Sequence, residues 1–351
     1  MKLWFTYFLL ATLFISCMKE EKIEFSKFPR EIKLVHKEIT TPNVLFMVGE
    51  MELLDSALII LNLKDDKFFQ IFTFPDLKYL GGYLEKGRGP NEEVSIDPYI
   101  RHLSGNKLMF KTLVSVKIAQ LNMRELIIIK TIHIPGELLN LNHPFIIDTI
   151  LYGYNVSKIT NKEFSGYVQG TNNIIDFGPS YPKVGKKIPP KFRNNIFAKA
   201  ITVKPDQSRF ASVYDLFPLL RIYSKNGNLL KQTYYNNGQK FPSAIMSHPT
   251  QEEANKVMQN YRKIKASKQY IYALYNGKTI GESKIEFNDD GIGGLTDTSN
   301  EIHVWDWDGN PIMKILLDRQ IFSFCITPDD KSIICTSINS LNILLKYDID
   351  N

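Results

Sequence analysis

Cysteine and histidine are scarce in this chain, which has three cysteines and six histidines among 351 residues. They do not recur at the short spacings that bind zinc, and no two histidines stand four residues apart as in helical metalloprotease motifs. The Gly-x-Ser-x-Gly turn of nucleophilic hydrolases is also absent. These absences argue against a zinc site and against a nucleophilic hydrolase.

A strong excess of one charge is lacking as well. The formal net charge is +6, and the basic residues form no dense patch, so we expect no nucleic-acid partner. Hydrophobic residues make up 44% and charged residues 23% of the chain, which are ordinary globular values that argue against disorder. Aromatic residues reach 12%, which suits a chain made largely of strands.

Long apolar runs are almost absent, and the one that stands out is Leu3–Ile15, behind Met1-Lys2. It has the length of a secretory signal and is too short to span a membrane as a mature helix. It ends at Ser16-Cys17, which resembles the lipobox of bacterial lipoproteins, with Phe14 where that motif usually has Leu. The resemblance implies a signal peptide over residues 1–16 and a diacylated Cys17. A simple secretory signal with an incidental cysteine is the alternative.

A short charged run, Met18–Lys22, follows Cys17. It resembles the export signal that sends some lipoproteins of Bacteroides-type bacteria to the outer surface, although such a run is also an ordinary solvated tether. We therefore expect an outer-membrane lipoprotein, facing either the periplasm or the outside, with a lipid-anchored tether over residues 17–30. The folded domain is expected to cover residues 31–351.

The other two cysteines, Cys325 and Cys335, flank the turn Pro328–Lys331. One residue of strand register decides whether their side chains share a face of a sheet. A disulfide is one alternative, and two buried free thiols are the interpretation we favour.

Short apolar runs separated by tight-turn residues are what the sequence has in abundance. The stretch Glu301–Asp350 holds four such runs and a fifth candidate, with Asp308–Asn310 and Pro328–Lys331 as turns. Gly and Asn tolerate positive φ, Pro presets φ, and Asp hydrogen-bonds its own turn. Strand, tight turn, strand, short link, strand, tight turn, strand is typical of one blade of a β-propeller. We interpret Glu301–Asp350 as one blade, the last in the chain.

The same layout recurs along the chain. Thr202–Asp206 resembles Cys325–Asp329, and Ile222–Asn228 resembles Val304–Asn310, which is the sign of stacked repeats. A strand within Ile23–Ile39 is expected to complete the last blade and close the ring. The pattern predicts an all-β, six-bladed β-propeller, with five or seven blades as alternatives. Its units start near Val44, Tyr99, Phe145, Ala200, Tyr270 and Ile302.

One segment, Ser247–Ala266, breaks the strand pattern. Ser247 can cap a helix, Pro249 suits its first turn, and acidic residues follow at its positive end. We predict one inserted helix over about residues 249–265, packed across a loop face of the propeller. The apolar stripe of this helix would consist of Ala254, Val257, Met258, Tyr261 and Ile264.

The loop Gly87-Arg88-Gly89-Pro90-Asn91-Glu92 stands between the first two units. Its glycines allow backbone conformations closed to other residues, and Pro90 fixes the chain after them. It lacks the Lys-Ser or Lys-Thr and the helix of a phosphate-binding loop. The loop is either a rigid inter-blade connection or a ligand site at the mouth of the central channel. In the second case, the contact residues would be Arg88, Asn91 and Glu92.

Taken with the strand end Leu80–Tyr83, the Asp308–Asn310 hairpin and the lipobox, this loop resembles the TolB-like six-bladed β-propeller lipoproteins of Bacteroides-type bacteria. The family loop commonly reads Gly-x-Gly-Pro-x-Glu-Phe, and here Glu93 and Val94 replace the aromatic residue. Asp176–Pro182 is also similar to a family segment and supplies Phe177 and Tyr181 as further candidate ligand contacts. The resemblance implies the architecture and no catalytic residue.

Enzymatic propellers of the lactonase and paraoxonase type hold an axial Ca²⁺ with oxygen ligands from different blades. The best candidates for such ligands here are Asp289 and Asp290, although a turn needs the same residues.

Our leading hypothesis is therefore a monomeric, lipid-anchored β-propeller of the cell envelope, without a cofactor, that binds a protein, peptide or glycan ligand. The alternative is a Ca²⁺-dependent lactonase or esterase-like hydrolase with an axial metal site. A third hypothesis makes the helix Ala254–Ile264 the contact to an envelope complex.

Overall fold

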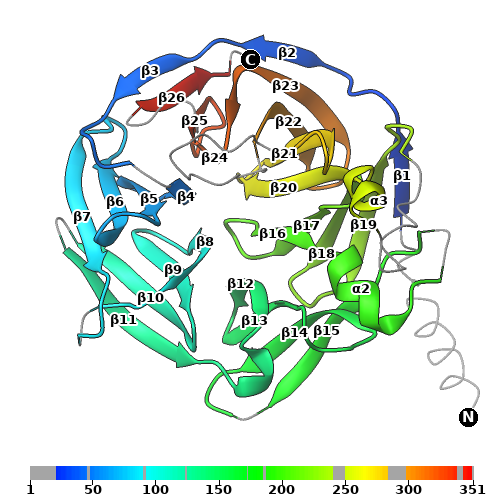
Figure 1. Cartoon of the computed structure of the whole chain (residues 1–351), viewed down its shortest axis with the longest axis horizontal. Coiled ribbons are helices and arrows are strands. Elements are labelled where there is room, and N and C mark those ends of the chain that lie inside the picture. Colours follow the sequence, from blue (N-terminus) through cyan, green and yellow to red (C-terminus); the bar gives the residue numbers. More distant parts are fainter. Residues whose placement is uncertain are drawn as a thin grey trace, which may run out of the picture.

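The computed structural model describes residues 21–45, 48–89, 92–122, 125–171, 173–184, 187–239, 250–283, 298–337 and 343–349. The strands of these residues form six sheets, arranged radially in a ring (Figure 1). Each sheet is one blade, and its innermost strand contacts the innermost strand of the next blade. The contact of β24 (Ser323–Ile326) with β4 (Val48–Leu53) closes the ring. The prediction of a six-bladed β-propeller is confirmed.

The first three blades each consist of four consecutive antiparallel strands, counted from the centre outward. Blade 1 contains β4, β5 (Ala57–Asn62), β6 (Lys67–Thr73) and β7 (Tyr79–Glu85). Blade 2 contains β8 (Ile96–His102), β9 (Lys107–Thr112), β10 (Ser115–Asn122) and β11 (Glu125–His133). After the 3-10 turn η1 (Gly136–Leu138), blade 3 contains β12 (Leu141–Ile147), β13 (Ile150–Asn155), β14 (Lys162–Val168) and β15 (Ile174–Ser180).

Blades 4 and 5 have five strands each, because a strand from the N-terminal segment is added to the outer edge. Blade 4 contains β16 (Lys199–Val203), β17 (Arg209–Tyr214), β18 (Leu219–Ser224), β19 (Leu229–Tyr235) and β1 (Glu21–Phe25). Blade 5 contains β20 (Met258–Ala266), β21 (Tyr270–Thr279), β22 (Ser299–Asp306), β23 (Pro311–Ile321) and β2 (Glu31–Leu34). Both added strands run parallel to their neighbours.

Blade 6 joins the two ends of the chain. It contains β24, β25 (Ser332–Thr336), β26 (Ile343–Asp348) and, as its outermost strand, β3 (Lys37–Thr40). β3 is antiparallel to β26, with Thr40 opposite Ile343. An N-terminal strand therefore closes the last blade, as predicted, but this strand is β3, whereas β2, which contains Ile32 and Leu34, joins blade 5.

The interpretation of Glu301–Asp350 as one blade is wrong, although its apolar runs are strands. β22 and β23 are the outer strands of blade 5, whereas β24 to β26 belong to blade 6. The two similarities noted in the sequence are still structural equivalences. Thr202–Asp206 and Cys325–Asp329 both lead from an innermost strand into a tight turn, and Ile222–Asn228 and Val304–Asn310 both enter the outermost turn of a blade. The turn residues show where two neighbouring strands of a blade are connected. They do not show which strand lies nearest the axis, and it is this innermost strand that begins a blade.

The N-terminal segment is part of the fold from Glu21 onward, earlier than the expected boundary at residue 31. It runs along the outside of blades 4, 5 and 6 (Figure 1, dark blue). Between β1 and β2, Phe28 is 5% exposed and packs in the core between blades 4 and 5. Residues 21–30 are therefore an outer strap of the propeller and not a free tether.

The predicted inserted helix is largely a strand. A helix does begin in this segment, where Thr250 and Glu253 form a capping box, but α3 covers only Gln251–Asn255. The residues from Met258 onward form β20, the innermost strand of blade 5. Two register shifts in β20, around Tyr261, disturb the alternation of a regular strand and leave its apolar residues about three positions apart. Apolar residues at this spacing are also expected on one face of an α-helix, which is why the sequence predicts a helix here.

Tyr261 and Ile264 of the expected stripe are buried in the core between blades 4 and 5, so the segment offers no helical partner surface. The other α-helix in the described residues is α2 (Pro190–Ile196), ahead of blade 4. No helix in the described ranges combines the length and apolar character needed to cross a membrane.

Hydrophobic cores lie between adjacent blades. β5 illustrates the reason: all six of its residues are buried, because both faces of a middle strand are covered by neighbouring blades. Cys325 pairs with Ile334, and Cys335 pairs with Phe324, so the two cysteines are one register step apart and face opposite sides of the sheet. Both thiols are buried and free, as we favoured from the sequence.

Candidate ligand-binding site

The Gly87–Glu92 loop is closed by its own carboxylate. Glu92 Oε2 accepts a hydrogen bond of 2.8 Å from the backbone N–H of Gly89, and a Cβ on Gly87 would collide with that carboxylate. The glycines are therefore needed to let the Glu92 side chain fold back over the loop. Arg88 is exposed, and Asn91 lies outside the described residues. The described part of the loop connects β7 of blade 1 to β8 of blade 2.

The second group of candidate contacts lies between blades 3 and 4. Phe177 is buried in their shared core and stacks on Tyr152, with ring centroids 4.1 Å apart. The Tyr181 hydroxyl donates a 2.5 Å hydrogen bond to Asn194 Oδ1 at helix α2. Asp289 and Asp290 lie outside the described residues, and within the described ranges no three His, Cys, Asp or Glu side chains gather to hold a metal ion.

A hollow with converging polar groups from all six blades lies on the propeller axis. It is a cavity of about 390 Å³ that receives residues from the innermost strands of all six blades. Neither Arg88 and Glu92 nor Phe177 and Tyr181 line it. The cavity opens among the turns that follow the innermost strands, including Ser104-Gly105 in blade 2 and Pro205 in blade 4. Its size falls in the range of small-molecule sites.

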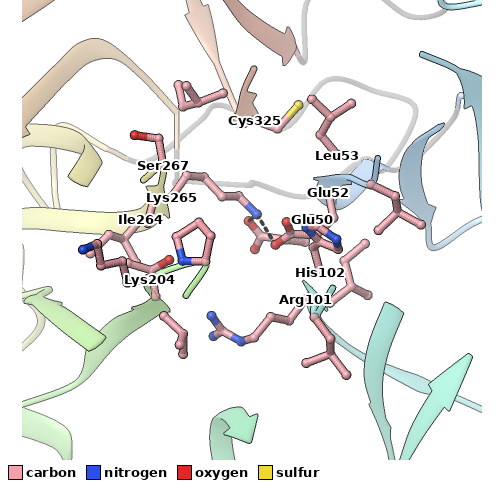
Figure 2. A pocket seen from close by; sticks show the side chains of 18 of the residues that line it. Glu50, Glu52, Leu53, Arg101, His102, Lys204, Ile264, Lys265, Ser267 and Cys325 are labelled. Atoms are coloured by element: carbon pink, nitrogen blue, oxygen red, sulfur yellow. Dashed lines mark hydrogen bonds and ion pairs between the residues drawn. The ribbon is translucent and has the colours of Figure 1, made fainter. Parts of the chain in front are cut away.

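Two pairs of charged side chains meet in this cavity. Figure 2 labels three of the four residues, Glu50, Glu52 and Lys265. β4 supplies Glu50 and Glu52, and β20 supplies Lys263 and Lys265. The Lys265 ammonium lies 2.7 Å from Glu52 Oε1 and 3.3 Å from Glu50 Oε1, and the Lys263 ammonium lies 3.2 Å from Glu50 Oε2. Each pair is spaced two residues apart, so that both of its members point to the same face of a strand.

Burial and charge act in opposite directions on the Glu50 carboxyl. Burial raises its pKa, but the ammonium groups of Lys263 and Lys265 outweigh burial and lower the pKa to about 2. Burial tends to lower the pKa of Lys265, and Glu50 and Glu52 raise it above its ordinary value. Glu50 and Lys265 are therefore both charged at neutral pH and lie 3.3 Å apart.

Arg101 reaches into the same cavity from β8, opposite Lys265 (Figure 2). Its Nε donates to the Pro144 carbonyl at 3.2 Å, and its Nη2 donates to the Ile201 carbonyl at 3.0 Å. These acceptors belong to β12 and β16, so the guanidinium is held by the backbones of two other blades.

The imidazole of His143 forms part of the wall. It lies against the Tyr99 ring, with centroids 3.7 Å apart. Burial lowers its pKa to about 3, and the nearby cations Arg101, Lys263 and Lys265 add to this effect against the opposing influence of Glu50. His143 is therefore neutral at physiological pH and contributes a polar, uncharged surface.

Comparison with known proteins identifies the fold family. A family model described as "TolB-like 6-blade propeller-like" matches residues 25–329. The chain belongs to this family. None of the curated proteins matches it. Two solved structures are similar in fold, and both are from Bacteroides.

The first is a member of the DUF4221 family from Bacteroides vulgatus, with 11% identity and a TM-score of 0.61; the match covers 90% of this chain and 97% of that one. The second is a putative exported protein from Bacteroides fragilis, with 10% identity and a TM-score of 0.59; the match covers 95% of this chain and 99% of that one. At these identities the likeness shows the fold alone.

Sequence reasoning missed the charged residues of the axial cavity in this TolB-like propeller. A usable signal was present, because Glu50 and Glu52 alternate with Met51 and Leu53, and Lys263 and Lys265 alternate with Ile264 and Ala266, which is the spacing of one strand face. Interpreting the second segment as a helix placed its lysines on a solvated face. In the structure this segment is a strand beside the axis, and Lys263 and Lys265 lie opposite Glu50 and Glu52.

Proposed function

We propose that this protein is a binding module of the cell envelope that takes its ligand, or the end of a larger protein, peptide or glycan ligand, into the axial cavity. The observation that supports this most strongly is the cavity itself, where residues from six blades converge on about 390 Å³. A site with walls from every blade is rigid, so little conformational order has to be gained on binding.

We also propose that a lipid on Cys17 anchors the propeller to the outer membrane, on its periplasmic or its outer face. The apolar run Leu3–Ile15 ahead of Ser16-Cys17 supports this, and the similar Bacteroides fragilis protein is described as a putative exported protein. Because β1 begins at Glu21, the chain between Cys17 and the propeller can span at most about 14 Å. The lipid would therefore hold the outer edge of blade 4 close to the membrane surface.

Replacing Cys17 by Ser tests the anchor. We expect Cys17→Ser to move the protein from the membrane fraction to the soluble fraction, because the acylated thiol is lost. The measurement is fractionation of cells followed by immunoblotting. Cys325→Ser, which changes a buried thiol of blade 6, is the matched control and should stay with the membrane. Unchanged membrane association of Cys17→Ser would contradict the anchor.

Blocking the mouth of the cavity tests the binding site. Ser104 is an exposed residue at the mouth, in the turn after β8, so Ser104→Trp should fill the entrance without disturbing the core. Thr149→Trp is the matched control, because Thr149 is exposed in the corresponding turn of blade 3 and does not line the cavity. We expect a ligand that raises the melting temperature of the wild type and of Thr149→Trp to have no effect on Ser104→Trp.

The panel for this experiment consists of mono- and disaccharides, di- and tripeptides, and small anions, each added to the purified full-length protein. A melting shift that survives Ser104→Trp would place binding elsewhere and contradict the proposal. The same holds if no compound of the panel shifts the wild-type protein.

The alternative of an axial Ca²⁺ enzyme gains no support from the described residues. The axial carboxylates Glu50 and Glu52 are already paired with Lys263 and Lys265 at 2.7–3.3 Å, so their charge is neutralised by ammonium groups. A cation would have to displace those groups before it could use the same oxygens.

A further inference from the structure

The walls of the axial cavity carry more positive than negative charge. Six lysine and arginine residues line it against three acidic ones: Arg101, Lys204, Arg262, Lys263, Lys265 and Lys268 against Glu50, Glu52 and Asp55. Two of these cations have acidic partners around the cavity: Lys204 lies 3.2 Å from Asp206, and Arg262 lies 3.0 Å from Asp215. In the interior, Lys263 and Lys265 are matched by Glu50 and Glu52.

Arg101 is the interior cation without a carboxylate partner. Among the described residues, no carboxylate oxygen lies within ion-pair distance of its guanidinium, which is hydrogen-bonded to the carbonyls of Pro144 and Ile201. Those two bonds use Nε and one N–H of Nη2, so that both N–H groups of Nη1 and the second N–H of Nη2 remain for a ligand, and Arg101 lines the cavity. A guanidinium remains charged in proteins, and a planar edge with two parallel N–H groups fits carboxylate and phosphate oxygens.

Arg101 is also rigidly placed and poorly solvated. Carbonyls from β12 and β16 fix its orientation, so little side-chain entropy would be lost when an anion binds. Burial lowers the pKa of Arg101, and Glu52 and Glu50 act on it only from a distance to raise it. A half-buried cation of this kind is stabilised by a direct counter-charge, which the described protein atoms do not supply.

We infer that the ligand of the axial cavity carries a small anionic group, a carboxylate or a phosphate, that binds to the open guanidinium edge of Arg101. This inference rests on the proposed function and names the chemistry of its site. Lys268 and Lys204 at the rim would attract the anion, and the neutral Tyr99 and His143 rings would pack beside the uncharged part of the ligand.

Titration of the full-length protein with sodium acetate and with sodium phosphate tests the inference. Each is compared with sodium chloride at constant ionic strength, and binding is measured by calorimetry and by the melting temperature. We expect the wild type to bind at least one of the two anions, and the preferred one to distinguish a carboxylate ligand from a phosphate ligand. Arg101→Gln should weaken that binding at least tenfold.

Two further variants separate specific recognition from general attraction. Lys225→Gln removes an exposed cation outside the cavity, which lies 3.6 Å from Asp148, and should change the affinity no more than about twofold. Arg101→Lys keeps the charge but loses the fork of donors, and we expect it to weaken binding at least threefold. If Arg101→Gln fails to fold, the affinity of Arg101→Lys for the anion still tests the inference.

The outcomes distinguish this inference from the proposed function. If neutral sugars or peptides bind in a way that Ser104→Trp abolishes, while acetate and phosphate do not bind, the inference is wrong and the proposed function stands. If no compound of any class binds, both are wrong. Anion binding of equal strength in wild type, Arg101→Gln and Arg101→Lys would overturn the inference, because the anion would then sit elsewhere.

Discussion

Replacing Glu163 by Gln should lower the free energy of unfolding by about 3–5 kcal/mol, because it leaves buried cations without their counter-charge. Glu163 on β14 is fully buried and joins blade 3 to blade 4. Its carboxylate lies 2.8 Å from the Lys199 ammonium and 2.8 Å from Arg221 Nη1, and it accepts hydrogen bonds from Tyr214 and Tyr223. Lys199 and Arg221 are 1% and 4% exposed, so water cannot replace the lost charge.

Urea unfolding of Glu163→Gln and of the exposed control Glu125→Gln on β11 would check this prediction. The control should stay within about 0.5 kcal/mol of the wild type. Burial raises the pKa of Glu163, but Lys199 and Arg221 outweigh it and lower the pKa below 4.5. The contribution of Glu163 is therefore present above pH 4.5 and is lost as the pH falls, so the two proteins should converge in acid. An equal stability of Glu163→Gln and wild type at pH 7 would refute this account of the network.

Replacing Phe28 by Ala should lower the free energy of unfolding by about 3 kcal/mol or more, because it empties part of the core between blades 4 and 5. The Phe28 ring packs on His303 and Trp305, with centroid distances of 4.4 and 5.7 Å. Its position in the N-terminal strap makes it a direct test of whether residues 21–30 belong to the fold.

Val35→Ala is the matched control for Phe28→Ala, because Val35 lies in the same N-terminal segment, between β2 and β3, but is 76% exposed. This control should cost no more than about 0.5 kcal/mol. Chemical or thermal unfolding of both variants gives the comparison. If Phe28→Ala were as mild as Val35→Ala, the strap would be a tether, as the sequence alone suggested.

Much of the fold could be predicted because its signals are local. Turns such as Pro205-Asp206 and Asp308-Gly309 lie where their backbone chemistry requires, and the apolar runs between turns are strands. The predicted number of six blades is right, although the predicted starts at Tyr270 and Ile302 both lie in blade 5 and blade 6 begins only at β24.

The sequence by itself therefore determined the strands, their turns and the propeller class, since each of these depends on neighbouring residues in the chain. The tertiary structure decided which strands share a blade, that 258–266 is a strand, and that residues 21–30 are a strap. It also brought Glu50 and Glu52 against Lys263 and Lys265, with Arg101 between the blades. These residues are up to about 200 positions apart in the chain, and only closure of the ring places them on one axis. The effect of a buried charged side chain depends on its partners on other strands, and a local sequence pattern does not specify those partners.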